Sequence, residues 1–271
     1  MVCGGRIYQL TNSGNSSSMQ SGTKKVLAVT LTITATIIIG SYFYYEDSNS
    51  AEDPRIMPAK TLFLKYDKDL ESDEYVQALS LLDTILDIYR NTPGYESSYE
   101  IGVLLNNKAT VYLVELETDL LTEKNVDQAA MNKILKAAED YTLQAIDIYE
   151  KWLAEMGTLS KEQIKNRISP FFAPDDPSLA GMNREKVLEK RVQSIQDAQI
   201  ETSRRISVSL TNLGMINRYL GELDKAQKNY EKAISIWDRN YTAQDNLNIL
   251  LNQPVKKRSM LSRLFPPERT D

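Results

Sequence analysis

The chain has 271 residues, enough for one or two domains with a buried core. Charged residues make up 25% of it and apolar residues 42%, a globular composition that excludes a disordered or wholly membrane-embedded chain. Histidine is absent and Cys3 is the single cysteine, which excludes histidine-based catalysis, intramolecular disulfides and the usual zinc sites.

The net charge of −5 is distributed unevenly. Residues 1–45 and 254–271 each carry +3, so residues 46–253 carry −11. An acidic body without a basic, aromatic-rich stripe repels phosphate groups. We therefore expect no nucleic-acid partner.

The chain begins with a polar tail, residues 1–25, which contains no acidic residue. An uncharged segment, residues 26–45, follows and has the length of about 20 residues that a helix needs to cross a bilayer. Lys24 and Lys25 precede this segment, and the aromatic residues 42–45 end it, as in a basic flank and an interfacial aromatic belt. The pattern predicts one uncleaved transmembrane helix that contacts the lipid bilayer.

Two other interpretations of residues 26–45 remain open. Four threonines alternate from Thr30 to Thr36, as in a half-buried strand, although strands of this length are exceptional. A cleaved export signal would have a shorter apolar core followed by small residues, whereas bulky aromatics follow here.

The charges around the segment predict its orientation. Lysines precede it, whereas acidic residues such as Glu46 and Asp47 follow it. The basic side of a membrane helix normally stays in the cytoplasm or the matrix. We therefore expect an extracytoplasmic body, in a periplasm, on a cell exterior or in an intermembrane space.

After a linker, residues 46–57, the sequence shows helical spacing of apolar residues and almost no strand signal. The segments 73–89, 137–152 and 224–237 share one pattern of small and large apolar residues on a single face. A recurring pattern of this kind indicates a helical repeat.

Residues 210–240, LTNLGMINRYLGELDKAQKNYEKAISIWDRN, resemble a tetratricopeptide repeat (TPR), a pair of antiparallel helices of about 34 residues. The matching positions are Leu210, Leu213, Gly214, Gly221, Ala226, Tyr230 and Ala233. Asn217 and Asp238 depart from the tyrosine and proline that the family prefers. The resemblance implies an all-α, TPR-like solenoid of about three helix pairs plus a capping helix, preceded by the transmembrane helix.

The expected solenoid covers residues 58–253. Its helical units are 59–92, 98–153 and 184–240, and a capping helix is expected at 243–253. A loop at 155–183 separates the second and third units. A basic tail, residues 254–271, follows the solenoid. The second unit exceeds the usual length by about 17 residues, which requires either an insertion between its helices or an extension of both. From Asn183 to Leu213 the chain lacks Pro and Gly, which favours one helix of more than thirty residues.

The resemblance also implies a binding groove lined by the first helix of each pair. Asn107 and Asn212 match the asparagine that holds the ligand backbone in peptide-binding members. The neighbours expected to share the groove wall are Lys108, Thr211, Met215, Arg218 and Tyr219. Arg204 and Arg205, with Lys108, resemble the residues that grip a terminal carboxylate in some members, although the full pattern is not present. The alternative is that all these side chains simply face solvent.

The loop 155–183 carries Phe171 and Phe172, which we expect either to pack over the groove or to dock a partner. Asp175 and Asp176 lie in a proline-rich turn, and Glu139 and Asp140 on a polar helix face, so we expect no metal or catalytic site there.

The predicted function is a membrane-tethered TPR adaptor that binds protein or peptide partners, in envelope assembly, translocation or quality control. We expect no enzymatic activity and no cofactor. The alternative is an extracytoplasmic carrier or sensor of a small molecule, with the loop 155–183 as its lid.

Overall fold

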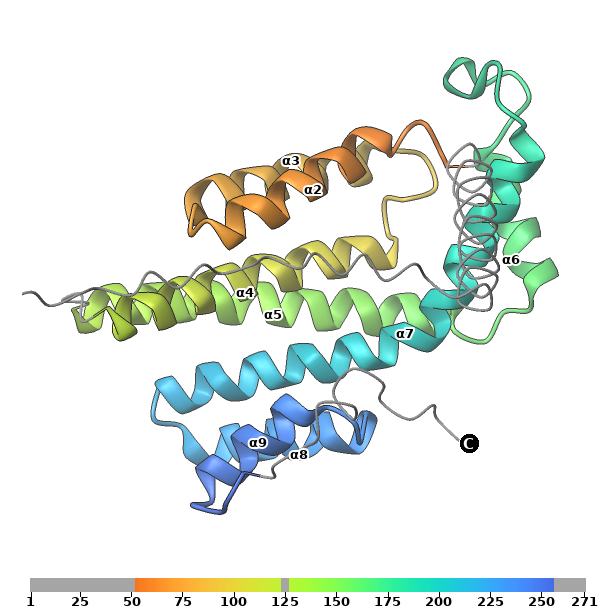
Figure 1. Ribbon diagram of the computed structural model, residues 1–271. Coiled ribbons are helices and arrows are strands. Elements are labelled where there is room, and N and C mark those ends of the chain that lie inside the picture. The colour runs from red at the N-terminus through yellow and green to blue at the C-terminus, as the bar shows by residue number, and fades with distance from the viewer. Residues whose placement is uncertain (1–51, 123–126, 256–271) are drawn as a thin grey trace, which may run out of the picture. The chain divides into compact units, whose positions relative to one another are not determined.

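The computed structural model describes residues 52–122 and 127–255, which all belong to the second of two compact units, Ala51–Asp271 (Figure 1). The predicted transmembrane helix at 26–45, the polar tail and the basic tail from residue 256 lie outside these residues. Among the described helices, none combines the length and the apolarity needed to cross a membrane.

The described residues form eight α-helices, two short 3-10 turns and no strand, so the predicted all-α class is confirmed for this part of the chain. The helices are α2 (Met57–Glu71), α3 (Tyr75–Asn91), α4 (Tyr99–Leu121), α5 (Gln128–Met156), α6 (Lys161–Ile168), α7 (Arg184–Tyr219), α8 (Leu223–Ile236) and α9 (Tyr241–Leu250).

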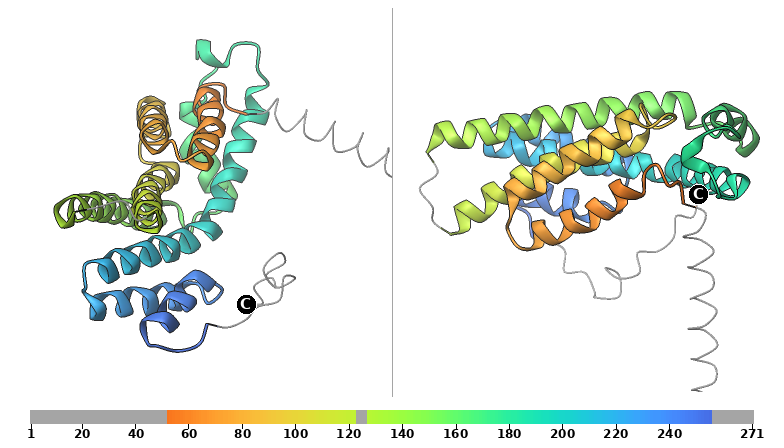
Figure 2. Two further views of the ribbon diagram at one scale, coloured as in Figure 1. Left: turned by 60° about the vertical axis from the view of Figure 1, so that its left-hand side comes forward. Right: turned by 90° about the horizontal axis from the view of Figure 1, so that it is seen from above.

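Three antiparallel hairpins organise the fold: α2 with α3, α4 with α5, and the second half of α7 with α8 (Figure 1). The first helices of the hairpins, α2, α4 and α7, run in the same direction, and α3 packs on α4 as α5 packs on α7 (Figures 1 and 2). Helix α9 packs on α8 at the end of the series. It ends at Leu250, three residues before the predicted limit of the cap.

The first and third hairpins close with the same turn. Asp73 and Gly221 both adopt a left-handed backbone, with φ of 59° and 75°. In each turn the next residue donates its N–H to the carbonyl five residues earlier, Glu74 to Asp69 and Glu222 to Asn217, at 2.8 Å. This is the helix-ending motif in which a left-handed residue turns the chain, so that the N–H group of the next residue bonds a carbonyl of the last helical turn. The two hairpins are therefore equivalent local structures 148 residues apart, since Asp73 corresponds to Gly221.

Glycine permits a close helix contact in each of the second and third hairpins. A Cβ at Gly102 would lie 2.5 Å from the Tyr149 ring, and one at Gly214 would lie 2.4 Å from the Tyr230 ring. Both tyrosines are buried, at 1% and 0% exposure. A larger residue at either glycine would push the two helices apart.

The extra length of the second unit lies in its helices, because α4 has 23 residues and α5 has 29. Of the two alternatives, an inserted segment or longer helices, the structure therefore has the second. The long helix expected from Asn183 onward is confirmed, since α7 spans 36 residues through Gly214.

Residues 155–183 are packed rather than an open loop. Helix α6 starts with a capping box between Ser160 and Gln163 and lies against the first half of α7. Its Ile164 and Ile168 are buried in a second core together with Trp152 and Phe172. This segment thus extends the fold beyond the hairpins.

Residues 52–57 are the described part of the predicted linker 46–57, and they pack against the helices instead of forming a free connection. Asp53 is buried at 4% exposure and accepts hydrogen bonds from Arg55 and from the Tyr95 hydroxyl. Arg55 stacks over Phe172, at 4.7 Å from the ring centroid, and donates to the Phe171 carbonyl. Residues 53–55 therefore bind the start of α2 to the α3–α4 turn and to the segment after α6.

Candidate functional site

Three cavities lie in sequence along α7. Their volumes are about 360, 280 and 270 Å³. The first and second share Glu201 and Arg205, and the second and third share Val208 and Trp237. We call this series of adjoining cavities the α7 groove. Its lining residues on α7 run from Val187 to Asn212, a length of about 37 Å at 1.5 Å per residue.

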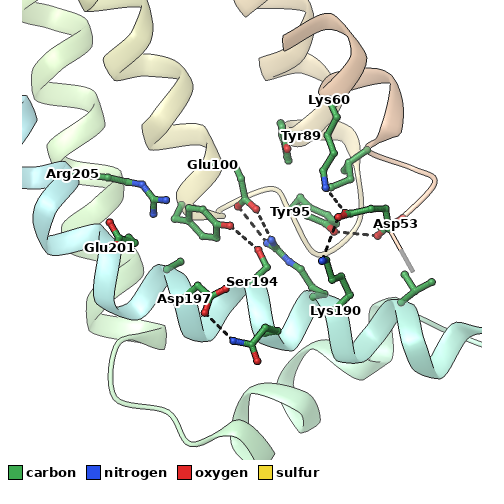
Figure 3. Close-up of a pocket in the computed structure, with 17 residues that line it drawn as sticks. Asp53, Lys60, Tyr89, Tyr95, Glu100, Lys190, Ser194, Asp197, Glu201 and Arg205 are labelled. Carbon is green, nitrogen blue, oxygen red and sulfur yellow. Dashed lines mark hydrogen bonds and ion pairs between the residues drawn. The ribbon is translucent and has the colours of Figure 1, made fainter. Parts of the chain in front are cut away.

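The first cavity has a mixed lining in which charged and hydroxyl-bearing side chains are prominent (Figure 3). Lys190, Ser194, Asp197, Glu201 and Arg205 follow one another along α7 at helical spacing. The opposite wall is formed by the start of α2, the end of α3 and the start of α4, through Asp53, Lys60, Tyr89, Tyr95, Tyr99 and Glu100. Segments far apart in the sequence thus build one cavity.

A buried ion pair crosses this cavity between α4 and α7. Arg191, which is 6% exposed, donates to both carboxylate oxygens of Glu100. Its guanidinium also lies over the Tyr95 ring, at 4.0 Å from the centroid. Burial alone would raise the pKa of Glu100, but the charge and hydrogen bonds of Arg191 outweigh burial and lower it. Glu100 therefore remains ionised beside Arg191.

Tyrosine hydroxyls complete the polar wall. Tyr99 shares a hydrogen bond of 2.7 Å with Ser194 on α7, and burial raises its pKa to about 12. Glu52 forms ion pairs with Lys60 and Lys190, which joins the start of the described chain to both α2 and α7. Paired polar groups thus link the walls of the cavity.

The second cavity combines an apolar surface with free polar groups. Val103 and Asn107 come from α4, Val208 from α7, and Trp237 from the end of α8. The side-chain amide of Asn107 makes no hydrogen bond to any described residue and is partly exposed. A primary amide can donate and accept at once, so Asn107 can bind a peptide group.

The third cavity adjoins a buried polar network. Asn240, the N-cap of α9, donates to the hydroxyls of Ser207 and Thr211 at 2.8 and 2.9 Å. Ser207 in turn donates to the Ala233 carbonyl on α8. This network fixes α8 and α9 on α7 and forms the base of the cavity.

The structure brings Asn107 and Asn212 to the same level of neighbouring parallel helices. Asn212 donates to Asn106 and Thr110 on α4, both at 3.3 Å, and it lines the third cavity. Its amide hydrogens are thus already engaged, whereas the amide of Asn107 is free. Asn107 is the better placed of the two for binding a ligand backbone.

Two other predicted groove residues are buried. Lys108 is 4% exposed, pairs with Asp83 at 2.6 Å and lies over the Tyr141 ring. Thr211 is 3% exposed and accepts from Asn240. Lys108 therefore holds α4 against α3 and α5 instead of facing the groove, which is a correction to the predicted groove wall. Thr211 contributes only to the floor of the third cavity.

Three further predicted residues lie beyond the end of the groove. Arg218 donates to Asn246 on α9, and Tyr219 donates to Glu117 on α4. Met215 is half-buried in α7. None of the three lines a cavity of the groove as described.

The two phenylalanines of the segment after α6 have different environments. Phe172 is 4% exposed in the second core, and Phe171 is 39% exposed against Gly94. Neither lines the α7 groove, so the expectation that they pack over the groove is wrong. Their neighbourhood contains a smaller cavity of about 160 Å³, lined in part by Phe171 and Trp152.

Sequence reasoning missed most residues that line the groove, including Glu201, Val208 and Trp237. The signal was present as spacing on α7, where Ala198, Glu201, Arg205, Val208 and Asn212 recur every three or four residues along one face. The face carries both polar and apolar residues, so no hydrophobic stripe marks it.

No protein-family model, curated protein sequence or solved structure matches this chain.

Proposed function

We propose that this protein is a membrane-tethered, TPR-like adaptor whose α7 groove holds an extended segment of a partner protein. The tether is the predicted helix at residues 26–45, and the adaptor is the helical body. Partners in envelope assembly, translocation or quality control fit this arrangement.

The single observation that carries the proposal is the succession of adjoining cavities along α7. Three cavities that share lining residues follow one another over about 37 Å along α7. An extended chain rises about 3.3 Å per residue, so the groove matches a segment of about 11 residues. A compact small molecule would use one cavity and leave the other two empty.

The TPR-like interpretation is supported by three features of the helical body. The first helices of the hairpins are parallel, the first and third hairpins close with the same left-handed turn, and α9 covers the last hairpin. Stacked hairpins of this type present their first helices as an extended binding surface. Here α4 and α7, two such first helices, supply most of the groove lining.

The alternative, a small-molecule carrier with a lid, requires a different arrangement of the cavity and its surrounding residues. A lid formed by residues 155–183 would have to contact the cavity that it closes. The described residues that line the α7 groove come from outside that segment. The extended groove therefore favours the adaptor.

The groove is tested by photo-crosslinking in intact cells, with the full-length chain carrying a photoreactive residue at Val208 or Asn107. We expect both positions to capture the same partner protein, through one continuous segment of it, because they line the same cavity. Mass spectrometry of the crosslinked peptides is the measurement. Ile200 on α7 and Leu143 on α5 are controls, since they are 63% and 46% exposed and line none of the groove's cavities. Equal capture from the control positions would contradict the groove assignment.

The tether is tested separately by protease protection. We expect protease on the extracytoplasmic face to digest the body, and protease restricted to the cytoplasmic or matrix face to leave it intact. Immunoblotting with an antibody against the body measures both outcomes, and detergent lysis is the control for access. Release of the whole chain from membranes by alkaline carbonate would contradict an uncleaved anchor.

A further inference from the structure

The turn that closes the first and third hairpins occurs a third time, at the end of α9. Asn252 has a left-handed backbone, with φ of 55°, and Gln253 donates its N–H to the Asn248 carbonyl at 2.7 Å. At Asp73 and Gly221 the same turn leads directly into the second helix of a hairpin, α3 or α8. The chain thus leaves α9 with the turn that precedes the second helix of two other hairpins.

The end of α9 exposes apolar side chains. Ile249 and Leu251 are 52% and 41% exposed, and Ala243 is the one buried residue of the helix. Ile249 lies three residues before the left-handed residue of its turn, as Leu70 does in the first hairpin. Leu70 packs against a buried core to which α3 contributes Leu82. The equivalent position is therefore covered in the first hairpin, where the second helix is present, and open on α9.

The sequence after this turn has leucine at two of the three positions that are buried in the other second helices. Those positions lie 5, 9 and 12 residues after the left-handed residue, and they are buried in both hairpins: Ala78 and Ala226, Leu82 and Tyr230, Ile85 and Ala233. Counted from Asn252, the second and third positions are Leu261 and Leu264, and Phe265 follows them. Lys257 takes the first position in place of alanine, where its aliphatic stem can pack and its charge can reach solvent.

Prolines delimit the segment that can form this helix. Pro254 follows the capping residue of the turn, at the first helical position, where proline is favoured. Pro266 and Pro267 stop a helix that precedes them. A helix of residues 254–265 is too short to be stable alone in water, so it needs an apolar face to pack against. The segment is basic, whereas residues 46–253 carry −11, and this attraction favours packing on the body.

We propose that residues 254–265 form a helix that packs on α9, as α3 packs on α2 and α8 packs on α7. Helix α9 is then the first helix of a fourth hairpin, and Leu261, Leu264 and Phe265 cover the apolar side chains at its end. The occupant of this face is the chain's own C-terminal segment. The hairpin closes the end of the series against a second copy and holds the basic residues of the segment on the body. This inference does not depend on what the α7 groove binds.

Hydrogen–deuterium exchange of the full-length protein in phosphatidylcholine vesicles tests the helix. We expect the backbone amides of residues 258–265 to exchange at least tenfold more slowly than in a free peptide of the same sequence, because these amides donate within the helix. Mass spectrometry of the peptic fragments is the measurement. Leu261→Asp combined with Leu264→Asp should abolish this protection, since it places two charges against the apolar end of α9.

Ser259→Asp combined with Ser262→Asp is the matched control. It adds the same charge, but the equivalent positions on α3 and α8 are exposed: Ser80 and Lys228, Asp83 and Glu231. We expect this variant to keep the protection of residues 258–265. Exchange in α4 and α5 should be the same in every variant, which shows that the body remains folded.

Crosslinking tests where the helix packs. Gly214 contacts Tyr230 between the two helices of the third hairpin, and the equivalent residues 31 positions later are Asp245 and Leu261. In a chain without its native cysteine, we expect cysteines at positions 245 and 261 to be joined within one chain by a short bismaleimide. Cysteines at positions 245 and 262 are the control, because Ser262 lies at an exposed position, and they should crosslink at least tenfold less. Mixing ¹⁵N-labelled with unlabelled protein separates links within one chain from links between copies.

Three results would overturn the fourth hairpin. The first is an absence of protection in residues 258–265, or a protection that the serine variant loses as completely as the leucine variant. The second is crosslinking between labelled and unlabelled chains, which would mean that a second copy covers α9. The third is a protection that appears only after phosphatidylglycerol is added to the vesicles, which would assign the segment to an anionic membrane surface. None of these results bears on the α7 groove, so the proposed function is tested separately.

Discussion

Replacing Arg191 by methionine is expected to lower the free energy of unfolding by about 3–5 kcal/mol, because it leaves the buried carboxylate of Glu100 without its counter-ion. Arg191 is 6% exposed, donates to both oxygens of Glu100 and lies over the Tyr95 ring. It therefore joins α7 to α4 and to the α3–α4 turn. Urea-induced unfolding monitored by circular dichroism measures the effect.

Matched variants distinguish the charge pair from simple packing. Glu100→Gln should cost a similar amount, since it leaves Arg191 charged and buried, whereas the double variant should recover much of the loss. Lys151→Met is the control, because the pair of Lys151 and Asp147 is 69% and 56% exposed and should contribute less than about 0.5 kcal/mol. Additive losses in the double variant would contradict a coupled pair.

The same pair predicts the response to acid. A carboxyl group with a lowered folded-state pKa contributes its full stability above the unfolded pKa of about 4.3, and that contribution disappears as pH falls through the folded value. Glu100 is such a group. We expect the free energy of unfolding to fall less steeply below about pH 4 in Glu100→Gln than in the natural protein. The difference should reach at most about 1.4 kcal/mol per pH unit, because one proton is involved.

Gly214→Ala is expected to destabilise the protein by about 1–3 kcal/mol, the cost of overpacking a well-packed contact. In an unobstructed helix the same change stabilises by about 1 kcal/mol, so the sign of the effect is diagnostic. The new Cβ would lie 2.4 Å from the Tyr230 ring, which is buried between α7 and α8. Chemical unfolding of the purified variant is the measurement.

A second substitution tests the cause. Tyr230→Leu removes the ring atoms that the new methyl group would meet, so Gly214→Ala should cost much less in that background. Gly102→Ala repeats the experiment in the second hairpin, where the Tyr149 ring lies 2.5 Å from the added carbon. A stabilising effect at both glycines would mean that the hairpins are packed more loosely than the structure indicates.

Helical periodicity and breakers allowed several elements to be predicted from sequence. The absence of Pro and Gly from Asn183 to Leu213 predicted a long helix, and α7 extends over 36 residues. The repeated apolar pattern of residues 73–89, 137–152 and 224–237 predicted helices, and α3, α5 and α8 cover almost all of these segments. These features follow from local backbone preferences, which a sequence expresses directly.

The groove residues were harder to predict, because their orientation depends on neighbours that are remote in sequence. Asn107 and Lys108 are adjacent on α4, yet Asn107 is free in the second cavity and Lys108 is buried against Asp83 of α3. The position of α3 relative to α4 decides this difference. The sequence does not reveal that position, and Lys108 was therefore expected in the groove wall.

Composition and periodicity by themselves determined that the body is helical, acidic and free of histidine, since these properties belong to single residues or to stretches of one helix. Only the tertiary structure decided that Phe172 lies in a second core and that Arg205 lines two cavities at once. Both outcomes include contacts between segments that are remote in sequence, since Arg55 lies over the Phe172 ring and Arg205 over the Tyr99 ring. The charge state, burial and partners of a side chain are set by all the elements packed around it.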